Sequence, residues 1–286
     1  MILYKKCILI LLFIILMSSV MAVSANDDNM TEITSNDTQT VLGDDLDDDP
    51  IEEMHEYYVS TDGDDFVGEG TSESPFASIN YAVSVANDNS RIIVREGTYK
   101  GTSNTGITIN KHLTIEAQSK ATIDAENKYW FFKVNPGSSL VLNNLKFIKG
   151  KTDSYSQLGA INNGGNLMVN NSSFDNMRTV MGVIFNEGDL IINHTTITNA
   201  YSSNMAQSLT NVGNCIVDNS RFTPTAAYSN DVAVSLYNYY NLTVLNSQPG
   251  YLQSSPVYDE YNYIQTFILI DNCTLTQLDL QNITGR

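Results

Sequence analysis

One pattern recurs along most of the chain and limits what it can fold into. An apolar residue is followed by another two positions on, by Asn four positions on and often by an apolar residue seven positions on. The units start at Leu113, Leu140, Leu167, Leu190, Cys215, Leu242 and Ile268. A nearly constant period of this size is typical of a solenoid or another array of repeats.

Each unit contains short strands and no helix. Apolar residues alternate with a period of two, which is strand spacing, and an earlier apolar segment in most units ends in Asn. Several short strands in about 26 residues, repeated about seven times, describe the rungs of an all-β parallel β-helix. A leucine-rich repeat is the competing solenoid, but its dense leucine framework and helical segment are missing. An immunoglobulin sandwich would not give a constant period.

Asparagine occupies two columns of corner positions in this repeat. Asn tolerates the left-handed backbone that a sharp corner needs, and stacked amides can bond from rung to rung. The column after the second apolar residue contains Asn144, Asn171, Asn219, Asn246 and Asn272, with His194 in one rung. The column four residues before each unit contains Asn163, Asn186, Asn211 and Asn238. The 32 Asn of the chain are therefore first a structural feature.

Residues 1–56 differ from the repeats. Residues 1–25 have Lys5 and Lys6, ten apolar residues and then small residues before Asn26, which predicts a cleaved secretory signal. Residues 26–56 have 12 acidic and no basic residues, which predicts a disordered acidic spacer. The β-helix domain is expected over residues 57–286, with no membrane span after signal cleavage and a possible truncation at its C-terminus.

Charge excludes one class of partner. The net charge is −17, and a protein that binds nucleic acid through its phosphates needs a basic surface instead. Most of that charge belongs to the predicted spacer, since residues 57–286 have 20 acidic and 13 basic residues. The folded part is therefore only mildly acidic.

Residues 57–112 are expected to form an N-terminal cap and the first strands. Ser74 and Pro75 suit the cap and first turn of a helix, and the spacing of Ile79, Ala82 and later apolar residues is helical. Residues 91–95 are expected to form a strand, and residues 97–99 a turn. A short helix here would cover the open apolar end of the solenoid.

The lead-in also resembles a known family. Four short segments resemble the opening of pectate-lyase-like right-handed parallel β-helix proteins. They are Tyr58-Val59-Ser60, Asp62-Gly63-Asp64, Pro75-Phe76 and Gly97-Thr98-Tyr99. With its export signal, acidic spacer and Asn-rich rungs, the chain resembles adhesin-like surface proteins of methanogenic archaea. The resemblance implies a right-handed helix and a secreted or cell-surface location. The fold also occurs in lyases, hydrolases and adhesins, so it does not fix an activity.

No catalytic cluster is found in the repeats. On the sheet that starts each unit, the outward acids are Asp189, Asp218 and Asp271, and they do not converge. Asp218 and Asp271 share a column two rungs apart, roughly 9.6 Å, at the edge of the range that a glycosidase needs. We therefore expect no catalytic residues, cofactor or metal, and a protein that binds rather than reacts. A polysaccharide lyase or glycoside hydrolase is the alternative, which leaves the enzyme question open.

One outward column is apolar and is the candidate binding face. Exposed apolar stripes mark covered surfaces or interfaces. The stripe consists of Val141, Met168, Ile191, Ile216 and Leu269, with Thr243 among them. Residues 247–263 are expected to form a long loop that either covers the stripe or adds Tyr251, Tyr258, Tyr261 and Tyr263 to a flat surface. The expected partner is carbohydrate or the surface of another cell.

The two cysteines after the predicted signal are expected to stay free. Cys215 points inward, and Cys273 lies two rungs later in the repeat. A separation near 10 Å exceeds disulfide reach, which requires Cα atoms within roughly 7 Å.

Overall fold

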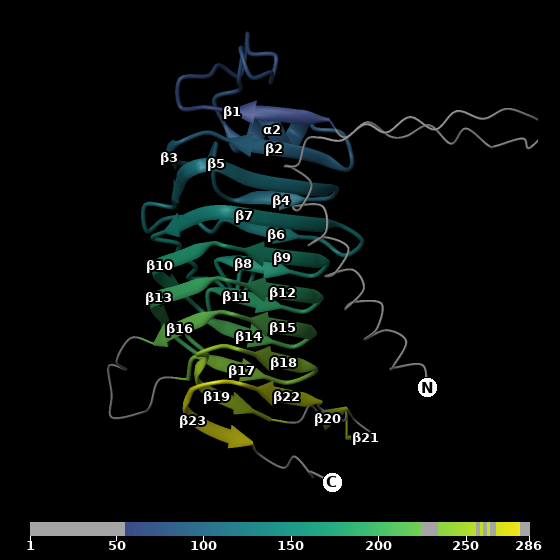
Figure 1. Cartoon of the computed structure of the whole chain (residues 1–286), viewed down its shortest axis with the longest axis vertical. Coiled ribbons are helices and arrows are strands. Elements are labelled where there is room, and N and C mark those ends of the chain that lie inside the picture. The colour runs from purple at the N-terminus through teal and green to yellow at the C-terminus, as the bar shows by residue number, and fades with distance from the viewer. Residues whose placement is uncertain (1–54, 225–233, 256–257, 260–261, 264–266, 281–286) are drawn as a thin grey trace, which may run out of the picture. The chain divides into compact units, whose positions relative to one another are not determined.

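The computed structural model describes residues 55–224, 234–255, 258–259, 262–263 and 267–280. The predicted signal, almost all of the spacer and Tyr261 lie outside these residues. The described part is a parallel β-helix with about seven rungs, in which strands stack into two long sheets (Figure 1). Among the described residues, no helix is long and apolar enough to cross a membrane.

The larger sheet, sheet A, contains the strand that starts each repeat. Its main path is β1 (Glu56–Val59), β2 (Ser90–Val94), β5 (His112–Asp124), β7 (Ser139–Ile148), β9 (Asn166–Asn170), β12 (Asp189–Asn193), β15 (Asn214–Asp218), β18 (Leu242–Leu245) and β22 (Ile268–Asp271). Beside this path lie β3 (Gly97–Lys100), β10 (Ser173–Thr179), β13 (Thr196–Ser202) and β16 (Arg221–Pro224). All seven predicted starting positions lie in one column, from Leu113 to Ile268. The period read from the sequence is therefore the rung of the solenoid.

Sheet B contains the short apolar segments that end in Asn. Its strands are β4 (Ile107–Ile109), β6 (Phe132–Val134), β8 (Ile161–Asn163), β11 (Ile184–Asn186), β14 (Leu209–Asn211), β17 (Leu236–Asn238), β19 (Gly250–Ser254) and β23 (Leu275–Leu280). Strands β20 (Tyr258–Asp259) and β21 (Asn262–Tyr263) form a separate antiparallel pair.

The core runs along the inside of the rungs. The inward residues of the strands are buried up to β19 and partly buried in β22 and β23, because alternate side chains of a strand point to opposite faces. The apolar residue seven positions into the repeat stacks on its counterpart: the rings of Phe147 and Phe174 are 4.8 Å apart and nearly parallel. Phe131 packs edge-on against Phe147 at 4.9 Å. The stacked apolar residues thus form one continuous core.

The two asparagine columns have different physical roles. All residues of the first column have left-handed backbones, with φ between 46° and 59°. They are Asn144, Asn171, His194, Asn219, Asn246 and Asn272. The second column has no such strain, and its side chains are buried in the solenoid. There each amide Nδ2 donates to the Oδ1 of the next rung at 2.7 Å, from Asn163 to Asn186, Asn211 and Asn238. The first column turns corners, and the second is a buried amide ladder.

A hydroxyl column follows the first asparagine column and was not predicted. Ser172, Thr195, Ser220 and Ser247 come directly after the corner residues and are buried. Each hydroxyl donates to the backbone carbonyl two residues earlier and accepts a backbone N–H from the preceding rung. These bonds satisfy peptide groups that the sharp corner removes from the sheet.

The capping helix begins later than predicted. Helix α2 spans Ile79–Val85, and its cap is Ser78, whose Oγ accepts the N–H of Tyr81 at 3.3 Å. Ser74 and Pro75 are not its start, because Phe76 is held in an extended pairing with the strand at Tyr58. The predicted helical spacing itself is confirmed, since Ile79, Ala82, Val83 and Ala86 are all buried.

Two further local predictions were wrong. Residues 97–99 belong to strand β3, which pairs with β5, and do not form a turn. Residues 247–263 are not one long loop, because Gly250–Ser254 forms β19 and pairs with β17 in sheet B. The rung is completed first, and the extra residues follow β19.

Candidate binding face

The predicted apolar stripe is a continuous outward column of sheet A. Its members are paired in register on successive rungs, in the order Val141, Met168, Ile191, Ile216, Thr243 and Leu269. The first five are partly exposed, and Leu269 is 45% exposed. Stacked neighbours at strand spacing shade one another, so each side chain offers one edge to the outside. The stripe is therefore a narrow apolar line across at least six rungs.

Polar columns border the stripe on both sides. Two residues before it lie Ser139, Asn166, Asp189, Asn214 and Asn241. Here Nδ2 of Asn214 donates to Asp189 at 2.7 Å, and Nδ2 of Asn241 donates to Oδ1 of Asn214 at 2.8 Å. Two residues after the stripe lie Asn143, Asn170, Asn193, Asp218, Leu245 and Asp271. The outer face of sheet A thus presents an apolar line between two columns that are polar except at Leu245.

In the first rungs, charged residues occupy the column that the stripe follows, so the stripe ends there. Arg91 continues the same column towards the N-terminus, with Glu56 on one side and Thr114 on the other. Arg91 pairs with Glu56 at 2.5 Å and also with Glu116. The hydrogen bond to Glu116 is the largest cause of the raised pKa of Arg91. This ion-paired end separates the stripe from the N-terminal cap.

One of the predicted tyrosines, Tyr251, does not join this face. Tyr251 lies in β19 of sheet B and is 7% exposed, so it belongs to the other sheet. Its backbone is fixed there by hydrogen bonds with Ser235, at 2.9 Å and 3.3 Å. Tyr258 and Tyr263 pair with each other through their backbones in the β20–β21 pair. Tyr261 lies outside the described residues.

The acids on this face are arranged as the repeat predicts. Asp218 and Asp271 share a column with Leu245 between them, two rungs apart. Asp189 lies in the opposite polar column. Asp218 also accepts Nδ2 of Asn246 at 3.0 Å. Hydrolysis through a carboxylate pair needs both groups at one bond, and this arrangement spreads them over separate rungs.

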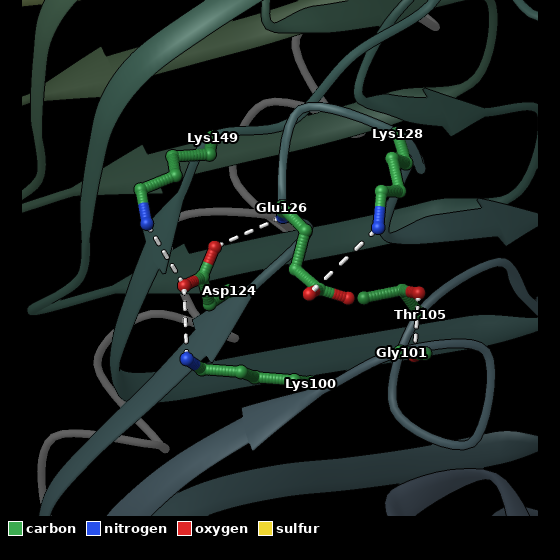
Figure 2. A network of polar contacts seen from close by, with 7 residues as sticks. All are labelled: Lys100, Gly101, Thr105, Asp124, Glu126, Lys128 and Lys149. Carbon is green, nitrogen blue, oxygen red and sulfur yellow. Dashed lines mark hydrogen bonds and ion pairs between the residues drawn. The ribbon is translucent and has the colours of Figure 1, made fainter.

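A buried carboxylate elsewhere is occupied by its own partners. Asp124, at the end of β5, is 3% exposed and lies between Lys100 and Lys149 (Figure 2). Its Oδ2 is 3.0 Å from Nζ of Lys149 and 3.8 Å from Nζ of Lys100, and its Oδ1 accepts the N–H of Glu126 at 2.9 Å.

These contacts decide the ionisation of Asp124. Burial alone would raise its pKa, but the hydrogen bond from Glu126 and the ammonium of Lys149 outweigh burial and lower the pKa below its usual value. A carboxylate held ionised by two lysines is a poor proton acceptor. Both of its oxygens are already engaged, so the cluster is a structural ion network at the rim of the first rungs.

A shallow depression lies away from the stripe, where β10 and β13 end. It encloses about 310 Å³ and is lined in part by Tyr155, Arg178 and Tyr201. Arg178 and Tyr201 are paired in register, and the backbone of Lys151 forms a β-bridge with Arg178 from the preceding rung. The ammonium of Lys151 is 3.3 Å from Asp153, which also lines the depression. This column was not predicted, although its members recur with the period of the repeat itself. Its basic and aromatic side chains suit an anionic or polar ligand.

The cysteines lie where the repeat predicts. Cys215 is 3% exposed, Cys273 is partly exposed, and both are free thiols. Burial raises the pKa of the Cys215 thiol well above its ordinary value, so it is a poor nucleophile. Sγ of Cys273 lies 3.1 Å from the carbonyl oxygen of Asp271, in the place that a serine occupies in the preceding rungs. Cys273 thus continues the hydroxyl column.

Comparisons with known proteins give similarity of fold only. No family model matches the chain, and no curated protein is similar to it in sequence. Its structure is similar to a rhamnogalacturonan lyase at 16% identity and a TM-score of 0.47, over 76% of this chain and 62% of that protein's length. It is similar to a pectate lyase at 15% identity and a TM-score of 0.44, over 82% of each chain. A pectin methylesterase in complex with a hexasaccharide shares 12% identity at a TM-score of 0.46, over 78% of this chain and 90% of that one.

Those neighbours are pectate-lyase-like parallel β-helix proteins. The fold supports several chemistries as well as binding, so a function must be argued from the side chains of a site. For this chain, the outer face of sheet A is a regular surface that the repeat builds over at least six rungs.

Proposed function

We propose that the protein is an exported, adhesin-like β-helix, secreted or held at the cell surface, which binds carbohydrate or a surface partner through the outer face of sheet A. The observation that supports this most is the apolar stripe between two polar columns. Apolar contact area with polar groups placed beside it is the usual composition of a ligand-binding surface. The regular spacing of the rungs suits an extended ligand that makes the same contact several times.

The shape of the face favours binding over catalysis. Several of its amides are held by neighbours within their own columns, as Asn214 is by Asp189 and Asn170 is by Asn143. Such ladders fix the side chains before a ligand arrives, which reduces the entropy lost on binding. The acids are too dispersed to attack one bond together. Weak contacts repeated along a rigid line give affinity through their number.

A glycan array with the chain that starts at Asn26 tests the proposal. We expect binding to a defined set of glycans, and we expect Ile191→Asp to weaken it about ten-fold or more, because a charge then replaces apolar contact in the centre of the stripe. Val212→Asp is the matched control, since Val212 is an exposed apolar residue, at 37%, outside the stripe. Equal loss in both variants, or none in either, would contradict a binding site on the stripe.

The depression at Arg178 favours a second candidate, a polysaccharide lyase or glycoside hydrolase. Arg178 lines this depression beside Tyr201, its partner on the next rung, and Asp153 lines it as well. Incubation with acidic and neutral polysaccharides tests this alternative through the release of reducing ends or unsaturated sugars. Turnover that is lost in Arg178→Ala would support the enzyme, and turnover lost in Asp218→Asn would place the reaction on sheet A and overturn the non-catalytic proposal.

A further inference from the structure

Charge is divided unevenly along the solenoid. Residues 57–178 contain 12 acidic residues and 11 Lys or Arg, so their charges nearly balance. Residues 179–285 contain eight acidic residues and one Lys or Arg, which is Arg221. These counts come from the sequence and so cover every residue of both segments. The rungs from β11 onwards (Figure 1) therefore carry a net negative charge.

In the stripe and its two polar columns, every charged side chain described from β7 to β22 is a carboxylate. Asp189 lies in the polar column before the stripe, and Asp218 and Asp271 lie in the column after it. Arg221 lies in β16, beyond the corner column, and pairs with Thr196 of β13. The stripe is therefore bordered by negative charge alone over these rungs.

Two of these carboxylates are held by amides of the following rungs. Asn241 donates to Asn214 at 2.8 Å, and Asn214 donates to Asp189 at 2.7 Å. On the other side of the stripe, Asn246 donates to Asp218 at 3.0 Å. An ionised carboxylate only accepts hydrogen bonds. A ligand group that contacts either acid must therefore bring a hydrogen to donate.

A sugar hydroxyl suits this arrangement, because it both donates and accepts hydrogen bonds. It can donate to Asp189 or Asp218 and accept from the amides of the same columns. A ligand carboxylate or sulfate has no hydrogen to donate to these acids. Its charge is also repelled by theirs, with no Lys or Arg among the described residues of these columns to offset the repulsion. The face is therefore complementary to an uncharged polymer of sugars and not to an acidic one.

We propose that Asp189 and Asp218 set the selectivity of the outer face of sheet A, which takes uncharged polysaccharides and excludes acidic ones. This inference rests on the binding function proposed above and names the class of its ligand. The two acids lie on adjacent rungs and on opposite sides of the stripe, so a sugar chain that crosses the middle of the stripe passes close to them. A site can discriminate by repelling a competitor as well as by contacting its partner.

Binding to matched probes tests the selectivity, using the protein produced without residues 1–25. The probes are hexasaccharides of glucose, galactose, mannose and N-acetylglucosamine, each paired with the form in which its primary alcohols are oxidised to carboxylates. We expect an uncharged probe to bind and its oxidised form to bind about ten-fold more weakly or worse. Failure of every probe would count against the binding function itself, and this inference would fall with it. Equal or tighter binding of the oxidised form, with Met168 protected from oxidation, would overturn this inference and leave the binding function intact.

A double variant, Asp189→Asn with Asp218→Asn, assigns the effect to these two residues. Each Asn removes a charge and keeps an oxygen that can accept from the neighbouring amide. We expect the oxidised probe to bind about five-fold more tightly or better than it binds wild type, and the uncharged probe to stay within about two-fold. The control is Glu69→Gln with Glu73→Gln, which changes the net charge equally at two exposed residues of the N-terminal cap. Equal gains in both double variants would overturn the assignment, and unchanged thermal unfolding would show that each fold is intact.

Salt separates repulsion from a steric cause. Salt screens exposed charges, so the oxidised probe should bind wild type more tightly as salt rises, whereas the uncharged probe should bind equally at all salt concentrations. In the variant with Asp189→Asn and Asp218→Asn, most of this salt dependence should disappear. An oxidised probe that stays equally weak at every salt concentration is excluded by its shape, and that result would overturn the role of the two acids.

Discussion

Asn186 donates a hydrogen bond from Nδ2 to Oδ1 of Asn211 at 2.7 Å, and neither residue is exposed to solvent. The same Nδ2 lies 3.0 Å from the carbonyl oxygens of Gly188 and Asn214. Its own Oδ1 accepts from Asn163 at 2.7 Å. One side chain thus links three rungs and the turn between the two sheets.

Loss of this amide should destabilise the whole domain. We expect Asn186→Ala to lower the free energy of unfolding by about 2 kcal/mol or more, because the buried Oδ1 of Asn211 loses the amide that donates to it and Nδ2 of Asn163 loses one of its two acceptors. Asn166→Ala is the control, since Asn166 lies on the exposed side of sheet A, and it should change stability by about 0.5 kcal/mol or less. Urea unfolding measures both. Equal effects would contradict a structural role for the buried ladder.

The corner column should respond to backbone conformation and not to side-chain chemistry. Asn219 has φ of 46° and is exposed. We expect Asn219→Val to lower stability by about 1–2 kcal/mol, because a β-branched residue is strained in the left-handed region. Asn219→Gly should stay close to wild type, since glycine adopts this conformation freely. Thermal unfolding compares the two, and a glycine variant as unstable as the valine variant would show that the amide matters instead.

The Asp124 network predicts a loss of stability in acid. Because the folded state lowers the pKa of Asp124, its ionised form contributes stability above the unfolded pKa of about 3.9, and this contribution disappears as pH falls through the folded pKa. The stability difference between wild type and Asp124→Asn should therefore be largest near neutral pH and shrink in acid. Asp153→Asn, which removes an exposed pair with Lys151 at 3.3 Å, is the control and should have a small effect throughout.

The two thiols should differ in reactivity. In the folded protein produced without residues 1–25, we expect a maleimide to label Cys273, which is partly exposed, and not Cys215, whose pKa is raised by burial. Mass spectrometry should find one label on the folded protein and two after denaturation. A disulfide between the two residues in the non-reduced protein would contradict the register of the rungs.

The repeat made the sheets predictable because each rung places the same residue type in the same environment. The inward, outward and corner positions followed from this spacing, and so did the difference between Cys215 and Cys273. What the sequence did not separate was the role of the two asparagine columns. Both show Asn at a fixed spacing, and only the fold shows that Asn219 turns a corner while Asn186 lies inside.

The errors arose where the period is interrupted. Leu236 and Leu252, which pair in sheet B, lie much closer in sequence than other paired positions of the repeat, so β19 was mistaken for part of a loop and Tyr251 for a surface residue. Helix α2 was placed too early because Ser74 and Ser78 both suit a cap. The carboxylate of Asp65 holds the backbone just before the helix, since it accepts the N–H groups of Ala77 and Ser78, and the helix therefore starts after Ser78. Contacts between residues that are distant in sequence leave no repeating pattern in the sequence itself.

Oxidation footprinting of methionine tests the central proposal most directly. Met168 lies in the stripe, whereas Met181 and Met205 are also partly exposed but lie outside it. With the glycan selected by the array bound at saturation, we expect oxidation of Met168 to slow several-fold and oxidation of Met181 and Met205 to stay unchanged. Unchanged oxidation of Met168 in the saturated complex would contradict binding at the outer face of sheet A.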